Sequence, residues 1–243
     1  MKKRLDEFLV EQGLIATRSR ARDAILRGLV QVDGQVVTKP GTFTPSAARL
    51  TVAPEAGTGY VSRGALKLIA ALDHFGFDPA GLNVLDAGAS TGGFTEVLLE
   101  RAAARVYAVD VGHGQLHERI AARPEVVSIE GQDVRTFEPA SPMDAIVADV
   151  SFISLTKILP RLMELTARRA WIVALIKPQF EVGRDAVGKG GIVKDAAART
   201  AAVGALENLI ASTPGWRVSG VIPSPIAGGS GNVELLIGAR RDG

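Results

Sequence analysis

The sequence predicts an α/β protein with a mostly parallel sheet, preceded by a smaller α+β unit. From about residue 61, apolar strand-like runs alternate with helix-like runs, a pattern typical of a parallel sheet covered on both faces. Before that point, two short helical patterns lead into valine-rich strands. The charge is also uneven: residues 1–59 carry nine basic and six acidic side chains, or +3, which leaves −1 for the rest of a chain whose total is +2.

The first unit begins with two predicted helices. Leu5, Phe8 and Leu9 fall at helical spacing, and a second helix is expected to begin near Thr17 or Ser19 and to end at Gly28. Arginines flank the apolar face of this second helix on both sides. They are Arg18 and Arg22 on one flank, and Arg20 and Arg27 on the other.

Valines alternate around an Asp-Gly pair in residues 30–37, which predicts a β-hairpin. Residues 49–52 predict another strand, and residues 53–60 have the composition of a linker. We therefore expect two domains, residues 1–59 with the linker and residues 60–243.

Seven strands and five helices are expected in the second unit. The strands are 83–87, 105–110, 126–130, 145–149, 170–177, 216–222 and 232–238. The helices are 64–74, 93–103, 116–122, 155–166 and 196–212.

A glycine-rich turn joins the first of these strands to a helix, and Asp86 precedes it. Ligands bind at this carboxyl edge of a parallel sheet, and small residues let a ligand approach the backbone. The spacing of Gly88, Gly92 and Gly93 fits neither the dinucleotide fingerprint nor a phosphate loop. A leading acid suits a cationic ligand such as S-adenosylmethionine, although the glycines alone are equally consistent with a tight turn.

Two further acids follow the next strands. Asp110 ends the second strand and can accept hydrogen bonds from ribose hydroxyls, and Asp133 can accept from an adenine amino group. Acids at successive strand ends make the pattern similar to the class I, Rossmann-like methyltransferases, which use S-adenosylmethionine and have a seven-stranded, mostly parallel sheet. The cofactor residues that this resemblance implies are Asp86, Gly88, Ser90, Thr91, Gly92, Gly93, Phe94, Asp110, Asp133 and Asp149.

Four charged residues resemble the Lys-Asp-Lys-Glu tetrad of FtsJ-type ribose 2′-O-methyltransferases. They are Lys67, Asp149, Lys177 and Glu234. A lysine can stabilise a developing oxyanion or accept the hydroxyl proton, and the carboxylates can orient the lysines. Each residue alone is better explained as a structural ion pair, but their order and their positions at strand ends favour catalysis.

Longer segments resemble the TlyA family of haemolysin-like rRNA 2′-O-methyltransferases over nearly the whole chain. They are residues 4–52, 61–64, 86–94, 149–155 and 176–181. The resemblance implies methylation of a cytidine ribose in ribosomal RNA or ribosomal subunits. Because the chain begins almost directly at its first helix, it resembles the shorter members, which act on the large subunit; the small subunit stays an alternative.

The N-terminal part resembles the alpha-L RNA-binding fold, in which arginines contact RNA phosphates. The expected RNA ligands are Arg4, Arg18, Arg20, Arg22, Arg27, Lys39 and Arg63. A merely solvated basic face is the alternative interpretation.

Composition excludes several other classes of protein. The chain has no cysteine and three histidines, which excludes disulfides, cysteine-based metal sites and cysteine nucleophiles, and we predict no metal site. No apolar run approaches the ~20 residues of a membrane span, so a cytoplasmic protein without stable membrane association is expected. The competing hypotheses are a membrane-active haemolysin and a non-catalytic rRNA-binding assembly factor.

Overall fold

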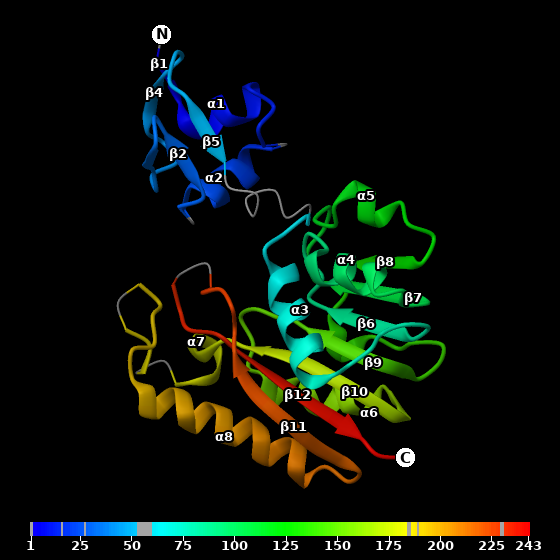
Figure 1. The fold of residues 1–243 in the computed structure, drawn as a ribbon. Helices are drawn as coiled ribbons and strands as arrows, with labels where there is room; N and C mark the ends of the chain where they lie inside the picture. The colour runs from blue at the N-terminus through cyan, green and yellow to red at the C-terminus, as the bar shows by residue number, and fades with distance from the viewer. Residues whose placement is uncertain are drawn as a thin grey trace. The chain divides into compact units, whose positions relative to one another are not determined.

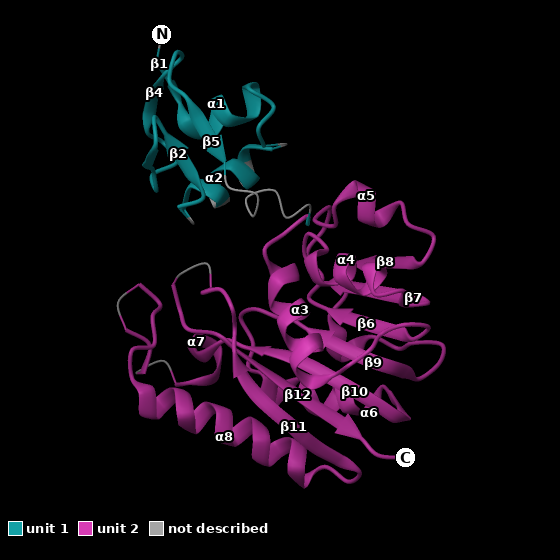
Figure 2. Cartoon of the chain, viewed as in Figure 1, with its two compact units in different colours: residues 1–60 teal, residues 61–243 magenta. Residues whose placement is uncertain are grey.

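The computed structural model describes residues 2–15, 17–26, 28–52, 60–183, 186–188, 190–228 and 231–243. The chain divides into two compact units, Met1–Tyr60 and Val61–Gly243, which Figure 2 distinguishes by colour. Each unit has its own hydrophobic core, so each is considered by itself.

The first unit combines two helices with two small antiparallel sheets. Its elements are β1 (Lys2–Arg4), α1 (Leu5–Glu11), α2 (Arg18–Leu26), β2 (Val30–Val32), β3 (Gln35–Val36), β4 (Phe43–Pro45) and β5 (Leu50–Val52). β1 pairs with β4, whereas β2 lies between β3 and β5. Leu5, Leu9, Ala24 and Ile25 form the centre of the core, which confirms the apolar faces predicted for both helices.

The second unit contains a seven-stranded sheet in the order β11-β12-β10-β9-β6-β7-β8 (Figure 1). The strands are β6 (Asn83–Ala87), β7 (Arg105–Asp110), β8 (Val126–Glu130), β9 (Met143–Ala148), β10 (Thr166–Ile176), β11 (Trp216–Pro223) and β12 (Leu235–Arg241). β12 runs antiparallel to both of its neighbours, and the five strands from β10 to β8 are parallel. The expected α/β class and mostly parallel sheet are therefore confirmed.

Helices cover both faces of this sheet. They are α3 (Gly64–Phe75), α4 (Gly93–Glu100), α5 (Glu118–Ala121), α6 (Leu159–Glu164), α7 (Pro178–Glu181) and α8 (Ala196–Ser212), with the 3-10 turns η2 (Val134–Thr136) and η3 (Leu155–Lys157). Leu206 and Ile210 of α8 share a core with Ile172 of β10 and Ile237 of β12, and α3 lies over the sheet in Figure 1.

Several predicted boundaries were wrong, for local reasons. The helix expected over 155–166 is split into η3 and α6, and α6 begins with Pro160 in its first turn, a position that proline favours. The helix expected to reach residue 103 ends at Glu100, because Ala102 adopts a left-handed conformation (φ 58°). The strand expected from residue 232 begins at Leu235, since Asn232 is held in a loop.

Two strands and a helix were not anticipated. β1 and β4 are three residues each and carry little alternation, and α7 is only four residues long. Elements this short give weak periodic signals in a sequence.

Candidate active site

The glycine-rich loop after β6 brings the backbone close to the end of β9. Gly88 has φ +87°, and a Cβ atom added there would lie 2.6 Å from the carbonyl oxygen of Asp149. Gly92 also has positive φ, and α4 begins at the next residue. The loop therefore needs glycine for its conformation and its packing, and it leaves the amino end of α4 facing the carboxyl edge of the sheet.

Three carboxylates follow this edge, and each has a different environment. Asp110 accepts hydrogen bonds from the backbone N–H groups of Ser90 (2.9 Å) and Gly112 (2.7 Å), which fixes the glycine loop. Hydrogen bonds from Arg135 hold the pKa of Asp133 below its usual range. Both acids lie on the wall of one cavity, although Asp133 is already engaged by an arginine.

Asp86 lies beneath the loop and is fully buried. Its Oδ2 accepts a hydrogen bond from the Thr95 hydroxyl at 2.6 Å, while Oδ1 has no hydrogen-bond partner among the described residues. Desolvation raises its pKa to about 7, and the nearby charges of Asp149 and Asp110 add to the rise. A cation at this edge would favour the ionised carboxylate.

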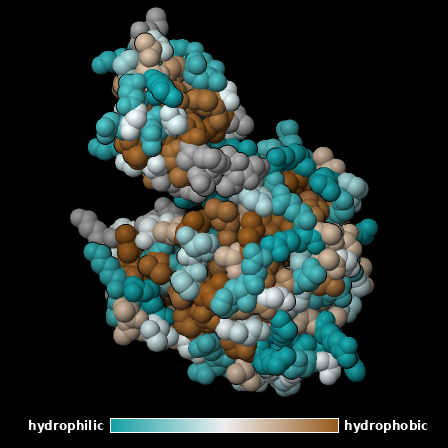
Figure 3. All heavy atoms as spheres, in the orientation of Figure 1, coloured by the Kyte–Doolittle hydropathy of each residue, from teal (hydrophilic) through white to brown (hydrophobic). Residues whose placement is uncertain are grey.

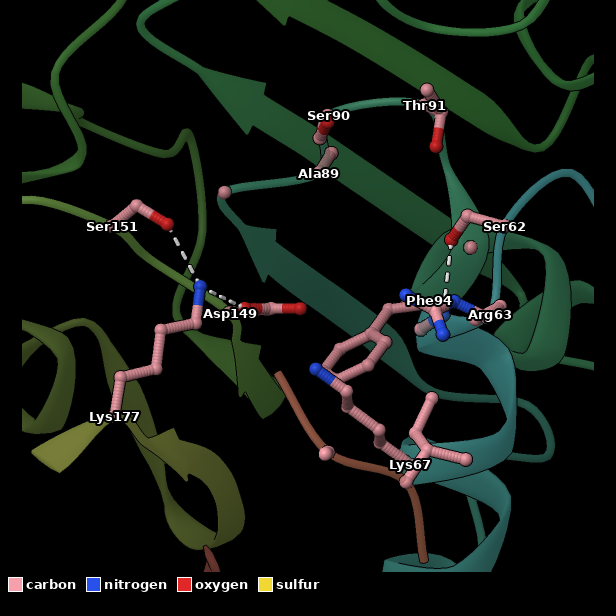
Figure 4. Close-up of a pocket in the computed structure, with 15 residues that line it drawn as sticks. Ser62, Arg63, Lys67, Ala89, Ser90, Thr91, Phe94, Asp149, Ser151 and Lys177 are labelled. Atoms are coloured by element: carbon pink, nitrogen blue, oxygen red, sulfur yellow. Dashed lines mark hydrogen bonds and ion pairs between the residues drawn. The ribbon is translucent and has the colours of Figure 1, made fainter. Parts of the chain in front are cut away.

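Lys177 follows β10 and points into the site (Figure 4). Its Nζ forms an ion pair with Oδ1 of Asp149 at 2.6 Å and donates a hydrogen bond to the Ser151 hydroxyl at 2.8 Å. Asp149 follows β9, the strand next to β10, so the parallel register delivers both side chains to one edge. The lysine is thus held in place by two partners.

Lys67 and Glu234 form a second pair. The Lys67 Nζ donates to Oε2 of Glu234 at 2.6 Å, and the two side chains are 10% and 3% exposed. Lys67 lies on α3 and Glu234 directly precedes β12, two segments that are adjacent in the fold but 167 residues apart in sequence. Burial of both charges requires this pairing.

These residues line two adjoining cavities of about 310 and 920 Å³, which share Gly88, Ser90, Asp149 and Ser151. The smaller is lined by Lys67, Lys177 and Asp149, by Ser90 and Thr91 of the loop, and by Gly93 and Phe94 at the start of α4 (Figure 4). The larger is lined by Asp110 and Asp133. Glu234 borders a further cavity together with Lys177. The structure therefore brings the four tetrad residues to one region, while Asp86 lies behind it.

The sequence did not single out an exposed aromatic residue at this edge. Phe152 is 91% exposed, adopts φ +66°, and packs against Phe180 with ring centroids 5.3 Å apart. Its loop is tied to α7 because Glu181 accepts hydrogen bonds from Ser154 and from the N–H of Leu155. An uncommon backbone conformation after an acidic strand end is not visible in residue periodicity.

The predicted RNA ligands have different surroundings. Both Arg4 and Arg18 contact the fully buried Asp6, and their hydrogen bonds lower its pKa, Arg4 having the larger effect. Arg20 donates to the carbonyl oxygen of Tyr60, and Arg63 lines the smaller cavity of the second unit. Arg22 and Lys39 lie on the surface of the first unit, whereas Arg27 lies outside the described residues.

The carboxyl edge fits S-adenosylmethionine by its own chemistry. Gly88 lines both cavities with backbone alone, Asp86 has a buried oxygen without a hydrogen-bond partner, and Asp110 retains acceptor capacity. Three carboxylates, those of Asp110, Asp133 and Asp149, line the larger cavity and can serve a cationic, hydroxyl-rich ligand.

Comparison with known proteins agrees with this geometry. The model of the FtsJ-like methyltransferases matches residues 60–241, and that of the S4 domain matches residues 3–43. The 16S/23S rRNA (cytidine-2′-O)-methyltransferase TlyA of Mycobacterium tuberculosis is 46% identical over 240 residues, which cover 98% of this chain and 89% of the relative. The chain belongs to the TlyA family of FtsJ-like methyltransferases. It is a methyltransferase whose cofactor is S-adenosylmethionine.

Other relatives of this methyltransferase carry different names. Hemolysin A of Brachyspira hyodysenteriae is 41% identical over 96% of this chain and 98% of its own length. The solved structure of a candidate hemolysin from Streptococcus thermophilus superimposes with a TM-score of 0.77 and 38% identity, covering 99% of this chain and 89% of that one.

No helix in the described part of the chain is long and apolar enough to cross a membrane. On the face shown in Figure 3, hydrophobic and hydrophilic residues are interspersed over each unit.

Proposed function

We propose that this methyltransferase methylates the ribose 2′-hydroxyl of a cytidine in ribosomal RNA. The observation that carries the proposal is the pair of lysines at the carboxyl edge, each fixed by a carboxylate at 2.6 Å. A ribose hydroxyl is a weak acid, and a positioned cation lowers the cost of the charge that develops on it. The names of TlyA relatives support both the RNA and the cytidine.

The cofactor residues proposed here are those at the carboxyl edge. They are Asp86, Gly88, Ser90, Thr91, Gly92, Gly93, Phe94, Asp110, Asp133 and Asp149. When bound, S-adenosylmethionine supplies an electrophilic methyl group. Asp110 would accept hydrogen bonds from its ribose, and Asp86 would act through its charge from beneath the loop, since it is buried.

We assign different tasks to the two lysines. Lys177, ion-paired with Asp149, is assigned to stabilise the developing oxyanion through the positive charge of its Nζ, and the hydroxyl proton is released to solvent water. Asp149 and Ser151 orient Lys177. Lys67, buried with Glu234, contributes a fixed positive charge on the other side of the cavity.

Phe152 supports a nucleic acid as the substrate. An exposed ring on the wall of the larger cavity, backed by Phe180, offers a stacking surface for the base attached to the reacting ribose. Base stacking on aromatic side chains is the usual way in which proteins hold an unpaired nucleotide.

Residues 1–59 are proposed as the RNA-binding domain and residues 60–243 as the catalytic domain. The S4 match and the net charge of +3 in residues 1–59 support this division. Arg20, Arg22, Arg27, Lys39 and Arg63 are the proposed phosphate ligands, while Arg4 and Arg18 also neutralise Asp6. A ribosomal substrate would place the enzyme in the cytoplasm.

The test is methyl transfer from labelled cofactor to isolated 30S and 50S subunits. We expect the parent enzyme to transfer label to ribosomal RNA. Lys177→Ala should reduce the rate of transfer by about 10²- to 10³-fold, which is the usual cost of losing one oxyanion donor. Cofactor binding should stay near that of the parent, because Lys177 contacts Asp149 and Ser151 rather than the glycine loop. Undiminished turnover would remove Lys177 from the mechanism, and vesicle leakage without any methyl transfer would favour the hemolysin interpretation.

A further inference from the structure

The β1–β4 ribbon of the first unit carries an exposed aromatic ring. Phe43 is 66% exposed, whereas Phe8 in the same unit is 3% exposed. Burying a phenylalanine side chain is worth about 1.5–3 kcal/mol. A ring left in solvent therefore forgoes that stabilisation, and its neighbours indicate what covers it.

The pairing of the two strands determines which residues share a face with Phe43. Arg4 lies directly opposite Phe43, and Lys2 lies opposite Pro45. Opposite residues of an antiparallel pair point to the same side, so these four side chains form one face of the ribbon, the ribbon face. The other face holds Thr44, which is 1% exposed, so the ribbon face is the outward one.

The charge of the ribbon face is positive. Lys2 is exposed and no described acid lies within ion-pair distance of it. Lys39, also exposed, precedes the turn into β4, where its carbonyl oxygen accepts a hydrogen bond from the N–H of Thr42 at 3.1 Å. Lys39 thus lies four residues before Phe43, on the far side of this turn, whereas Lys2 lies at the other end of β4, opposite Pro45.

The arginines of this unit are less available. Arg4 and Arg18 share the buried carboxylate of Asp6, and Arg18 also contacts Glu7 at 3.0 Å. This cluster contains two arginines and two acids, so its local charge is balanced. The surplus positive charge near the ribbon therefore resides on Lys2 and Lys39.

We propose that the ribbon face binds single-stranded ribosomal RNA, with Phe43 stacked on an unpaired base and Lys2 and Lys39 on the neighbouring phosphates. An aromatic ring flanked by cations is the arrangement that binds single-stranded nucleic acid. The inference rests on the proposed function, because it takes RNA as the partner, and it adds a contact that the arginine-lined helix α2 does not provide.

Two kinds of variant separate stacking from charge. Phe43→Ala should weaken binding to the substrate subunit by about 5- to 150-fold, the range that 1–3 kcal/mol of stacking represents, with the salt dependence unchanged. Lys2→Ala and Lys39→Ala should weaken binding at low salt and each reduce the salt slope by about 1. Val36→Ala is the matched control, because Val36 is 56% exposed on a different sheet of the same unit and should bind like the parent.

The choice of replacement distinguishes RNA from a protein partner. Phe43→Tyr should retain parental affinity and Phe43→Leu should not, since leucine keeps the apolar surface but cannot stack. A Phe43→Leu variant that binds like the parent would indicate an apolar protein contact and overturn the proposal. Thermal unfolding of each variant verifies that the first unit stays folded.

A fluorescent variant gives a direct measurement. Both native tryptophans, Trp171 and Trp216, are buried in the second unit, so Phe43→Trp adds an exposed fluorescent reporter. Its signal is the emission of the variant minus the emission of the parent under the same conditions. Stacking predicts quenching when the subunit binds, and unchanged emission with a bound subunit would overturn the inference. If the parent binds and methylates subunits and Phe43→Ala binds them with the same affinity, the RNA contact at the ribbon face is refuted while the proposed function stands. If the parent neither binds nor methylates subunits, the proposed function itself is refuted.

Discussion

Replacing Asp86 with Asn should stabilise the cofactor-free enzyme, and the effect should depend on pH. The carboxylate is fully buried, and desolvation raises its pKa from 3.8 to about 7. Between pH 4 and pH 7 the unfolded chain loses this proton while the folded chain keeps it, so stability falls as the pH rises. Above pH 7 both states are ionised and the loss is complete.

The size of the effect follows from the pKa. One pKa unit corresponds to ~1.4 kcal/mol, so a rise from 3.8 to about 7 costs about 4 kcal/mol at pH 8. Asn is neutral at every pH, and its side-chain oxygen can still accept the hydrogen bond from Thr95. The Asn amide NH2 takes the place of Oδ1, which has no partner, and an unpaired buried donor offsets about 1–3 kcal/mol of this gain. Asp86→Asn should therefore be more stable than the parent by about 1–3 kcal/mol at pH 8, and this advantage should be about 2–3 kcal/mol smaller at pH 5.

Urea unfolding followed by circular dichroism at pH 5, 6.5 and 8 measures this difference. Asp78→Asn is the control, because Asp78 is exposed and its replacement should change stability by less than about 0.5 kcal/mol. A stability difference that does not change with pH, or an Asp86→Asn enzyme less stable than the parent at pH 8, would refute a buried carboxylate whose pKa is raised by desolvation.

The same variant tests the electrostatic role of Asp86 toward the cofactor. A cationic ligand favours ionised Asp86, so the parent should bind S-adenosylmethionine more tightly at pH 8 than at pH 6. Asp86→Asn should bind more weakly at pH 8 and lack this pH dependence. Calorimetric titration at both pH values measures the affinity for S-adenosylmethionine. If the affinities of the parent and of Asp86→Asn change with pH in the same way, the charge of Asp86 does not contribute to cofactor binding.

Three further substitutions test the site. Gly88→Ala should cost at least about 1–2 kcal/mol of stability and reduce cofactor affinity, because φ is +87° and a Cβ would contact Asp149, as thermal unfolding and calorimetry would show. Lys67→Met should destabilise by about 3–5 kcal/mol by leaving Glu234 unpaired, whereas adding Glu234→Leu should restore stability but not methyl transfer; restored activity would make the pair purely structural. Phe152→Ala should raise KM for the RNA by roughly 5- to 150-fold and Phe152→Tyr should not, and equal KM values would exclude stacking.

Most of the sheet was predictable because its strands are apolar and of ordinary length. β6 and β7 were predicted with their observed bounds, as was helix α8. Parallel strands deliver the residues that follow them to one edge, so the positions of Asp149 and Lys177 could be inferred together. In the structure, Nζ of Lys177 lies 2.6 Å from Oδ1 of Asp149.

Other features depend on contacts that no local pattern encodes. The partner of Lys67 is 167 residues away, and the loop that contains Asn232 is set by a hydrogen bond to the N–H of Val193. Asp86 was expected among the cofactor ligands, yet it is buried beneath the loop, because the turn at Gly88 carries the chain over it. The exposure of Phe152 likewise results from a left-handed residue that periodicity does not reveal.

The most direct test of the central claim is the chemical identity of the methylated nucleoside. The purified enzyme is incubated with labelled S-adenosylmethionine and with 30S or 50S subunits, and the RNA is digested and separated by liquid chromatography and mass spectrometry. We expect the label to appear as 2′-O-methylcytidine and Lys177→Ala to abolish nearly all of it. Label in a base-methylated nucleoside, or equal 2′-O-methylation by Lys177→Ala, would contradict this expectation.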